Sequence, residues 1–550
     1  MRSLSYLISL LCFLPLAAQD NSNPFSGIDM GNPFAALPDP EAKVTYHNPV
    51  IPGFYSDPSV CRVGDDYYLI TSTFEYFPGV PVFHSKDLIN WEQIGHCIHR
   101  KEQIPNGINI FAATLRYHDG VFYMITTNIT GGGNFYVTAT HPAGPWSDPI
   151  WIKAAGIDPD LFFDDDGKAY VISSPMILYE IDLETGELGI PGRKIWNGTG
   201  GRYAEGPHLY KKDGYYYLMA AEGGTEEAHM ETIARSHSIW GPYTENPANP
   251  ILAHANAAGQ GNPIQGVGHA DIIQAHDDSW WIVFHGYRNI SDKVHHILGR
   301  ETCLAPVCWP KNGWPVVNGN GTATVDMTCP TLPLSPVPKG PERVDFNGPQ
   351  LGLEWNHIQF PVQTNYSLTA REGFMRLTGA GEVITRRYNP CTFVGRRLTN
   401  HYFTATTRVE FDPQNENEEA GMTLLNNGSH FDIMINKKGE KRILVVKLQF
   451  GQTLYRSEEI ILKPGPVNLR ITGNRTTFTF SYSQGDEPYA DIETVDSKFL
   501  ATETVGWFTG IYVGLYATGN GAVSKANADY DWFEYVIEDP PAEQSGRSGM

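Results

Sequence analysis

An internal repeat is the feature that most limits how this chain can fold. Five copies of one pattern (an apolar strand, a tight Asp/Gly turn and an aromatic-rich second strand) follow one another between residues 46 and 340, and each has the form of a β-hairpin. Aligned on the second turn residue, the copies lie 54, 47, 47 and 64 residues apart, which leaves room for a second hairpin in each interval. Four strands in each of five units predict a five-bladed β-propeller, because a closed ring of blades protects the edges of its sheets. The copies span residues 56–73, 111–128, 158–174, 205–223 and 269–286.

The residue nine positions before each turn anchor is the second informative feature. Equivalent positions of propeller blades surround the central axis, so we expect these five side chains to converge on one funnel. Three of them are carboxylic acids. Like charges held together in a low-dielectric funnel destabilise a fold, so their presence indicates a function that retains them. A single Asp before Pro is usually a turn or capping residue, whereas three acids at equivalent positions favour a catalytic site. The five residues are Asp57, Phe111, Asp158, Glu205 and His269.

Three acids in one pocket suit the hydrolysis of a glycosidic bond. In an inverting enzyme, one carboxylate deprotonates water while a carboxylic acid protonates the leaving oxygen. Asp57 is the predicted base, since a turn with backbone donors would keep it ionised, and Glu205 with its longer side chain is the predicted acid. Asp158 is the predicted modulator, whose charge would raise the pKa of Glu205 and which would orient the sugar. Asp160 is an alternative for this third role, because two residues further along a strand it faces the same side.

Several further residues are candidates for contacts in the funnel, each with a structural alternative. His269 is either a satisfied core histidine or a contact of a cation on the propeller axis or of its water shell. Arg300, which closes the last blade, either donates to sugar hydroxyls or forms a surface salt bridge. Aromatic side chains would form an apolar platform for a sugar ring or pack in the core. These aromatic residues are Phe54, Tyr55, Phe74, Phe77 and Phe111.

Charge and targeting features indicate the partners and the compartment. The formal charge of −21 argues against a nucleic-acid or anionic-membrane partner, either of which needs a basic face, and is compatible with a neutral substrate. Residues 1–18 have the form of a secretory signal, and no later segment approaches the ~20 apolar residues of a membrane helix. Together with this signal, seven Asn-x-Ser/Thr sequons predict a secreted, extracellular glycoprotein. Six cysteines remain after residue 18, an even number that allows disulfides without fixing their pairing. The sequons begin at Asn128, Asn197, Asn289, Asn320, Asn365, Asn427 and Asn474.

A change of texture near residue 340 predicts a second domain. Residues 303–345 are rich in Pro, Gly and Cys, as expected for a closing turn and an interdomain linker. The alternating segments 403–411, 443–450 and 512–516 then favour a β-sandwich, so the whole chain is predicted to be all-β. The predicted division is a signal peptide at 1–18, a leader or linker at 19–43, the propeller at 44–340, the sandwich at 341–538 and a disordered tail at 539–550.

An ordered set of short motifs resembles glycoside hydrolase family 43. The motifs are Asn48-Pro49, the run Gly-Phe-Tyr-Ser-Asp-Pro-Ser at 53–59, Asp158-Pro159, Glu-Gly-Pro-His at 205–208 and Gly-His-Ala at 268–270. The resemblance implies an inverting five-bladed propeller in which Asp57 is the base, Asp158 the pKa modulator and Glu205 the acid.

The same resemblance implies roles outside the three acids. Arg300 matches a position that contacts the terminal sugar in related xylosidases, and His269 matches one associated with a central calcium or its waters. No cofactor is implied as a requirement, and a structural calcium is the only metal suggested. The second domain resembles the concanavalin-like sandwich of the β-xylosidase and arabinofuranosidase branch, where it can lend a loop to the pocket rim.

The choice of sugar rests on a departure from the commonest family pattern. Phe-Ala-Ala stands at 111–113, where Trp-Ala-Pro is frequent in the family. This segment, together with Ala-Glu-Gly-Gly-Thr at 221–225 and His229-Met230, is similar to arabinofuranosidases that debranch arabinoxylan. The resemblance therefore implies release of terminal α-L-arabinofuranosyl residues from arabinoxylan, with the α-1,3-linked arabinose of doubly substituted xylose as a narrower expectation. A β-D-xylosidase or a bifunctional enzyme is the alternative, since the two sugars present similar hydroxyls.

Two other classes of propeller are compatible with the repeat alone. A non-catalytic carbohydrate-binding propeller predicts the loss of at least one acid, and all three are present. The fructan-cleaving five-bladed enzymes use a retaining mechanism, and their Asn-Asp-Pro-Asn start is absent from this sequence.

Overall fold

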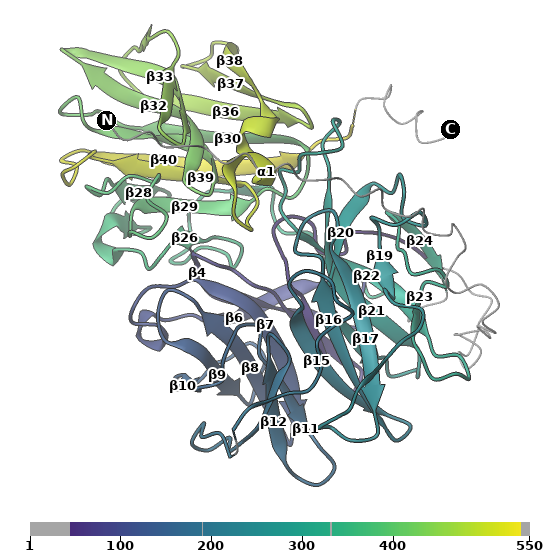
Figure 1. Cartoon of the computed structure of the whole chain (residues 1–550). Helices are drawn as coiled ribbons and strands as arrows, with labels where there is room; N and C mark the ends of the chain where they lie inside the picture. The colour runs from purple at the N-terminus through teal and green to yellow at the C-terminus, as the bar shows by residue number, and fades with distance from the viewer. Residues whose placement is uncertain (1–43, 190, 330–332, 541–550) are drawn as a thin grey trace, which may run out of the picture.

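The computed structural model describes residues 44–540 except 190 and 330–332, and Figure 1 shows them as two β-rich parts. The predicted signal peptide at 1–18, the leader at 19–43 and residues 541–550 of the predicted tail lie outside the described residues. The first part is a five-bladed β-propeller and the second is a β-sandwich, which confirms the predicted all-β fold.

Each propeller blade is one sheet whose four main strands follow one another in the chain. In every blade the first two strands form the hairpin predicted from the repeat, as in the third blade, where Leu161 pairs with Val171. The strands of blades one and two are β2 Ser59–Val63, β3 Asp66–Ile70, β5 Gly79–Ser85, β6 Glu92–Ile98, β7 Ile110–His118, β8 Val121–Asn128, β9 Gly133–Ala139 and β10 Ile150–Trp151. Those of blade three are β11 Asp160–Phe163, β12 Ala169–Ser173, β13 Ile177–Ile181 and β14 Arg193–Lys194. Those of blades four and five are β15 Glu205–Lys212, β16 Tyr215–Glu222, β17 Met230–Ser236, β18 Thr244–Glu245, β19 Leu252–Ala253, β20 Ile264–Gln274, β21 Trp280–Arg288, β22 Glu301–Cys308 and β23 Val316–Val317.

The two ends of the propeller are joined to each other. Strand β1 (Val44–His47) pairs with β24 (Asp326–Cys329), which follows the fifth blade. Just after β1, the Asn48 amide donates to the carbonyl oxygen of Leu304 in β22 at 2.9 Å and accepts from its N–H at 2.8 Å. These contacts hold the start of the propeller against its last blade, so the ring is closed by main-chain and amide hydrogen bonds.

The second domain packs two antiparallel sheets face to face around one apolar core. Its β30, β33 and β39 coincide with the three segments predicted from alternation. One sheet contains β25 Arg343–Val344, β27 Tyr366–Ser367, β28 Met375–Thr378, β30 Tyr402–Glu410, β36 Val467–Asn474, β37 Thr477–Ser483, β38 Ala490–Asp496 and β40 Asn527–Ile537. The other contains β29 Thr392–Arg397, β31 Glu419–Asn426, β32 Ser429–Lys438, β33 Lys441–Phe450, β34 Thr453–Arg456, β35 Ile460–Ile461 and β39 Tyr512–Thr518. Short helical turns are η1 Lys101–Gln103, η2 Gln363–Asn365, η3 Ser497–Leu500 and α1 Thr502–Val505.

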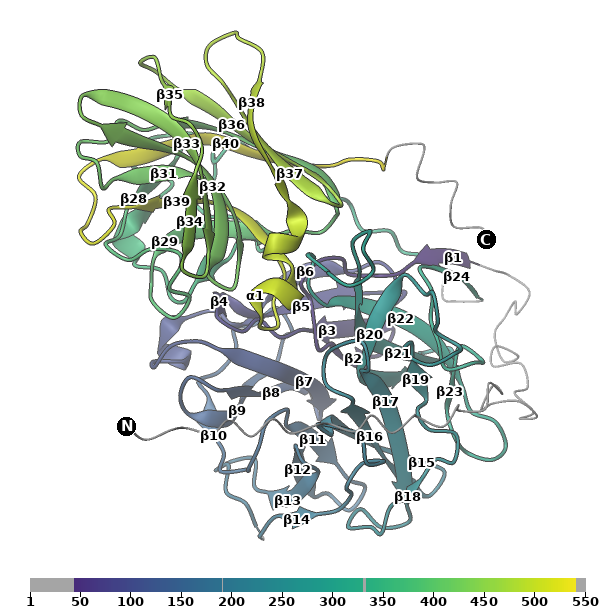
Figure 2. The ribbon, with the colours of Figure 1, turned by 45° about the horizontal axis from the view of Figure 1, so that its top comes forward.

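The sandwich is attached directly to the first propeller blade. Strand β4 (Tyr76–Phe77) pairs with β26 (His357–Ile358), and the rings of Tyr76 and Tyr512 stack across the interface with centroids 3.9 Å apart. Figure 2 shows α1 reaching from the sandwich to the propeller. Beyond α1, a side chain at Gly299 would come within 2.8 Å of the backbone nitrogen of Gly510. Glycine at both positions therefore allows the sandwich segment before Gly510 to lie against the chain that carries Arg300.

Two further findings concern the cysteines and the presence of membrane-spanning helices. Cys61, Cys97, Cys303, Cys308 and Cys391 are buried free thiols, so these five cysteines form no disulfide within the described residues. Over the same residues, the structure contains no helix with the length and apolar character needed to span a membrane.

Candidate active site

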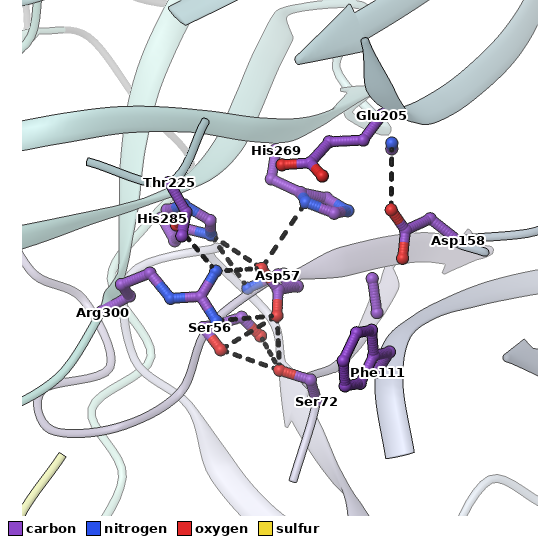
Figure 3. Close-up of polar contacts among 12 residues, drawn as sticks. Ser56, Asp57, Ser72, Phe111, Asp158, Glu205, Thr225, His269, His285 and Arg300 are labelled. Atoms are coloured by element: carbon purple, nitrogen blue, oxygen red, sulfur yellow. Dashed lines mark hydrogen bonds and ion pairs between the residues drawn. The ribbon is translucent and has the colours of Figure 1, made fainter. Parts of the chain in front are cut away.

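A small cavity of about 120 Å³ lies where the inner ends of the blades meet, and it brings the predicted acids together. Asp57, Asp158 and Glu205 all line it, together with His269 and Phe111. Figure 3 shows these five side chains around one space. The nine-residue count therefore selected five positions that meet at one site.

The backbone departs from regular β-geometry at each of these positions. Asp57, Asp158 and His269 have φ of 55°, 52° and 50°, a left-handed conformation that costs of order 1–3 kcal/mol per residue and is concentrated at functional sites. Glu205 opens β15 and is followed by a register shift, with Gly206 at φ 54°. Phe111 and His269 also lie beside register shifts in β7 and β20. Bulges of this kind redirect side chains out of the sheet, here toward the cavity.

Asp57 is buried among hydrogen-bond donors. Its Oδ1 accepts from Nη1 of Arg300 at 2.8 Å and lies 3.0 Å from Nδ1 of His285. Its Oδ2 accepts from the hydroxyls of Ser72 at 2.6 Å and Ser56 at 3.0 Å. Burial alone would raise the pKa of Asp57, but the charge of Arg300 and the neighbouring imidazoles hold it well below its usual value. The residue predicted as base is therefore ionised near neutral pH.

Glu205 and Asp158 have the opposite tendency. Burial, followed by the charge of Asp57, raises the pKa of Glu205 to about 7. Burial and the charges of Glu205 and Asp57 raise the pKa of Asp158 well above its ordinary value. Asp158 was predicted to supply the charge that raises the pKa of Glu205, whereas in the structure that charge comes from Asp57. Asp158 is held at the cavity by the backbone N–H of Gly206, which donates to its Oδ2 at 3.4 Å.

One wall of the cavity is aromatic. Phe74 and Phe111 lie 5.1 Å apart, and Phe508 from the sandwich stacks on Phe74 at 5.6 Å. The predicted substrate contact of Phe54 needs correction, because its side chain is fully buried and does not line the cavity. Its ring lies behind Phe74, 5.8 Å away, in an apolar cluster shared by the two domains. Tyr55 and Phe77 likewise belong to core clusters and not to the cavity lining.

Arg300 lines the cavity, but its contacts go beyond the predicted role of a sugar donor. Besides Asp57, its Nη1 donates to the hydroxyl of Thr225 at 3.0 Å, and its Nη2 donates to the carbonyl oxygen of Phe508 at 3.4 Å. Its Nε is buried and has no hydrogen-bond partner among the described residues. Arg300 thus links the base to the sandwich loop.

Four residues of the site were missed by the sequence reasoning. Ser72 follows β3 and His285 lies within β21, each of which is the second strand of a repeat hairpin. The nine-residue count selects only positions at the start of the first strand. His285 was open to detection, since it falls inside the fifth repeat copy. Thr225 belongs to the 221–225 segment that carried the resemblance. Phe508 had no signal of its own, because nothing in the local pattern reports contact with another domain.

The implied calcium can be tested against the side chains around His269. Asp57, His269 and His285 form a cluster with ligand atoms within 4.8 Å of one another. Calcium takes six to eight oxygen ligands, whereas this cluster offers two imidazoles and one carboxylate that is already paired with Arg300. Burial lowers the pKa of His269 to about 3 despite the charge of Asp57, so its ring is neutral. These side chains do not fit a calcium site.

A protein cation instead lies near the propeller axis. The guanidinium of Arg116 is 3.0 Å from Oδ1 of Asp160 through Nε and 2.9 Å from Oδ2 of Asp271 through Nη1. Its Nη2 is 3.0 Å from Nδ1 of His208, and Asp271 also accepts from the hydroxyl of Ser59 at 2.7 Å. These five residues come from five different blades. Asp160, the alternative modulator, therefore contacts the axial guanidinium, whereas Asp158 lines the cavity.

Comparisons with known proteins agree with this geometry. Residues 46–315 match the glycosyl hydrolases of family 43, and residues 343–536 match the β-xylosidase C-terminal concanavalin A-like domain. A non-reducing end α-L-arabinofuranosidase of Bacteroides ovatus is 43% identical over 90% of this chain and 95% of its own length. A xylosidase/arabinosidase of Butyrivibrio fibrisolvens is 39% identical over 89% of this chain and 99% of its own.

Solved structures show the same two-domain arrangement. One described as Bacteroides ovatus Xyloglucan PUL GH43B superposes with a TM-score of 0.86 at 42% identity, over 90% of this chain and 100% of the other. A GH43 protein of Bacillus licheniformis gives 0.84 at 33% identity, with the same shares covered. With its propeller, its three acids and these relatives, the chain belongs to glycosyl hydrolase family 43 and is a glycoside hydrolase.

Proposed function

We propose that this protein is a secreted, inverting exo-α-L-arabinofuranosidase that removes terminal arabinofuranosyl residues from arabinoxylan. The observation that carries the proposal is the cavity itself. At about 120 Å³ it is far smaller than the ~300–1,000 Å³ of ordinary ligand pockets. Such a cavity suits one terminal sugar, and the acids around it have opposite protonation states.

The proposed reaction assigns one task to each acid. Ionised Asp57 takes a proton from water as the water oxygen bonds to the anomeric carbon. Protonated Glu205 gives its proton to the glycosidic oxygen, and the bond from the anomeric carbon to that oxygen breaks. Asp158, a neutral neighbour, donates to or accepts from hydroxyls of the bound sugar and orients it. After release, Asp57 gives its proton to the solvent and Glu205 takes up a proton from the solvent.

The aromatic wall and Arg300 support binding of a single neutral sugar ring. Phe74, Phe111 and Phe508 offer apolar contact for one face of the ring, while Arg300 and Thr225 offer polar atoms at its edge. No basic surface is needed for such a substrate, which is consistent with the charge of −21.

The names of relatives guide the choice of sugar and polymer. The Bacteroides ovatus relative is named an α-L-arabinofuranosidase, which favours arabinose at the cavity. The name of a similar solved structure includes xyloglucan, so arabinose-bearing xyloglucan is a second candidate polymer. Other relatives are named β-xylosidases, including one of Bacillus subtilis at 34% identity, so β-D-xylosidase activity is the second candidate function.

One comparison tests the proposal. Purified protein is assayed on 4-nitrophenyl α-L-arabinofuranoside and 4-nitrophenyl β-D-xyloside, and the anomer first released is identified by proton NMR. We expect a higher kcat/KM on the arabinofuranoside and release of the inverted anomer. Release of the retained anomer would contradict the roles of Asp57 and Glu205, and a higher kcat/KM on the xyloside would establish the second function.

Arabinose release from three polymers then tests the linkage. Arabinoxylan with singly substituted xylose, arabinoxylan with doubly substituted xylose and arabinose-bearing xyloglucan are compared at equal arabinose content. The proposal expects faster release from arabinoxylan, including the α-1,3-linked arabinose of doubly substituted xylose. Release from xyloglucan alone would replace arabinoxylan as the proposed substrate.

A further inference from the structure

Two buried histidines connect the predicted base to the predicted acid, and neither takes part in the proton transfers described above. His285 lies beside Asp57 in Figure 3, with Nδ1 3.0 Å from Oδ1 of the aspartate. Its Nε2 is 3.2 Å from Nδ1 of His229, and the two rings stack with centroids 4.9 Å apart. On its other side, Nε2 of His229 lies 3.9 Å from Oε1 of Glu205.

The contact between His229 and Glu205 differs from the others in this series because it is not a hydrogen bond. Nε2 of His229 is buried and has no hydrogen-bond partner among the described residues. At 3.9 Å it does not form a hydrogen bond with Glu205, so the interaction between them is electrostatic. The sign of that interaction depends on whether Nε2 carries a hydrogen or a lone pair.

A backbone carbonyl fixes the tautomer. Nδ1 of His229 lies 3.4 Å from the carbonyl oxygen of Gly266, which can only accept, so Nδ1 carries the hydrogen. Nδ1 of His229 is then also the donor toward Nε2 of His285, and the hydrogen of His285 is on its Nδ1, directed at Asp57. Burial lowers the pKa of His229 well below its usual value and that of His285 to about 4, so each ring is neutral with one hydrogen.

The reverse arrangement gains one hydrogen bond but places two pairs of acceptor atoms against each other. It would let Nδ1 of His285 accept from the backbone N–H of Asp57 at 3.2 Å. It would also place the lone pair of that Nδ1 against the Asp57 carboxylate at 3.0 Å and the lone pair of His229 Nδ1 against the Gly266 carbonyl. Both contacts are repulsive in a buried site.

We propose that His229 and His285 are positioning residues whose fixed tautomers set opposite protonation states on the two catalytic carboxyls. At one end, the Nδ1–H of His285 stabilises the Asp57 carboxylate. At the other end, the Nε2 lone pair of His229 disfavours the Glu205 carboxylate and favours its protonated form. The inference rests on the proposed roles of Asp57 as base and Glu205 as acid.

Other titratable and charged groups lie near His229 and Glu205, and the variants of His229 described below leave these groups in place. His229 is also near His269 and Arg300. Glu205 is near Asp57, Asp158 and Arg300. Because none of these is altered when His229 is replaced, a change in the titration of Glu205 reports the contribution of His229.

The first test is the pH profile of His229→Phe. Activity is measured on a glycoside with an alkyl leaving group, methyl α-L-arabinofuranoside, because its departure requires protonation by Glu205. We expect the basic limb of kcat/KM to move down by about one pH unit, which is a tenfold loss above the limb. Phenylalanine is more apolar than histidine, so burial alone would move the limb upward. A limb that stays in place or rises would overturn the proposal.

Two matched variants separate this effect from packing. His229→Gln can place an amide oxygen near the position of Nε2, and we expect it to return the limb toward that of the wild type. His254→Gln removes another buried propeller histidine, which bonds Ile264 and Ala323 outside the site, and we expect its limb to be unmoved. Equal shifts in the Phe and Gln variants of His229, or a similar shift in the His254 variant, would contradict the proposal.

A measurement on the wild-type protein is independent of activity. Long-range proton–nitrogen NMR of protein labelled with nitrogen-15 histidine identifies the tautomer of each ring, and the signals of His229 are those lost in His229→Phe or His229→Gln. We expect the Nδ1–H form at His229 and His285, and an Nε2–H form at His229 would overturn the proposal. If the wild type cleaves only the xyloside, methyl β-D-xyloside is used for the profiles. If it cleaves neither sugar, the proposed function fails while the tautomers are still measured.

Discussion

Arg300 donates from Nη1 to Oδ1 of Asp57 at 2.8 Å, and both side chains are buried. This ion pair keeps Asp57 ionised although burial opposes its charge. The charge that remains on Asp57 then contributes, after burial, to the raised pKa of Glu205. Together with burial, this pair contributes to the different protonation states of the two carboxyls, as acid–base catalysis requires.

Replacing Asp57 with Asn tests the base. The amide keeps an acceptor for Arg300 and a similar shape, but it cannot take a proton from water. We expect kcat to fall by about 10²–10⁴-fold with an unchanged circular dichroism spectrum. Asp65→Asn, on the exposed turn of the same blade, is the matched control and should retain full activity. Near-normal turnover by Asp57→Asn would remove Asp57 as the base.

The pH dependence of activity tests the acid. Glu205 is active only while protonated, so kcat/KM should fall as the pH rises through about 7, the raised pKa of Glu205. On the acidic side, activity should persist until Asp57 takes a proton, which happens well below its ordinary pKa. The measurement is a kcat/KM profile on a substrate with a poor leaving group.

Replacing Glu205 with Gln should abolish that basic limb. The loss should be about 10²–10⁴-fold on a glycoside with a poor leaving group and much smaller on a 4-nitrophenyl glycoside, which departs without a proton. An equal loss on both substrates, or a limb that persists near pH 7, would argue against Glu205 as the acid.

The repeat explains how much of the site could be predicted. Blades are equivalent, so a fixed offset from each turn finds residues that meet at the axis, and this placed Asp57, Asp158 and Glu205 in one cavity. The same count does not show which of the other two acids is ionised and raises the pKa of Glu205. That property depends on partners such as Arg300, which lies far away in the sequence but 2.8 Å away in space.

The second domain explains what could not be predicted. Phe54 was expected to contact the sugar, yet the sandwich covers it and joins it to a shared core. Phe508 reaches the cavity because the chain near Gly510 lies against Gly299. Both outcomes depend on how the two domains dock, and no periodic pattern within either domain carries that information.

The axial guanidinium leads to a prediction about metal removal. Arg116 supplies the positive charge beside Asp160 and Asp271 near the propeller axis. We expect treatment with EDTA to change neither kcat/KM nor the midpoint of thermal unfolding. A loss of activity on chelation that added calcium restores would contradict this.

Replacing Arg116 with Met tests the same guanidinium by a different measurement. The variant leaves two buried carboxylates without their partner, and we expect it to lower the free energy of unfolding by about 3–5 kcal/mol. Lys168→Met, which breaks an exposed ion pair with Glu180, is the control and should behave like the wild type. A variant of Arg116 as stable as this control would show that the guanidinium does not hold the blades together.

The sandwich should be part of the active site and not only an appendage. Phe508 lines the cavity and stacks on Phe74. We expect Phe508→Ala to lower kcat/KM on the arabinofuranoside by about tenfold, since an aromatic pair contributes roughly 0.5–1.5 kcal/mol beyond its buried area. Most of the loss should appear in KM, because the wall binds the sugar but moves no proton. Phe499→Ala removes an exposed ring of the same domain and should leave both constants unchanged. If Phe508→Ala instead lowered kcat alone with KM unchanged, the ring would act on the position of the neighbouring Arg300, whose Nη2 donates to the Phe508 carbonyl oxygen.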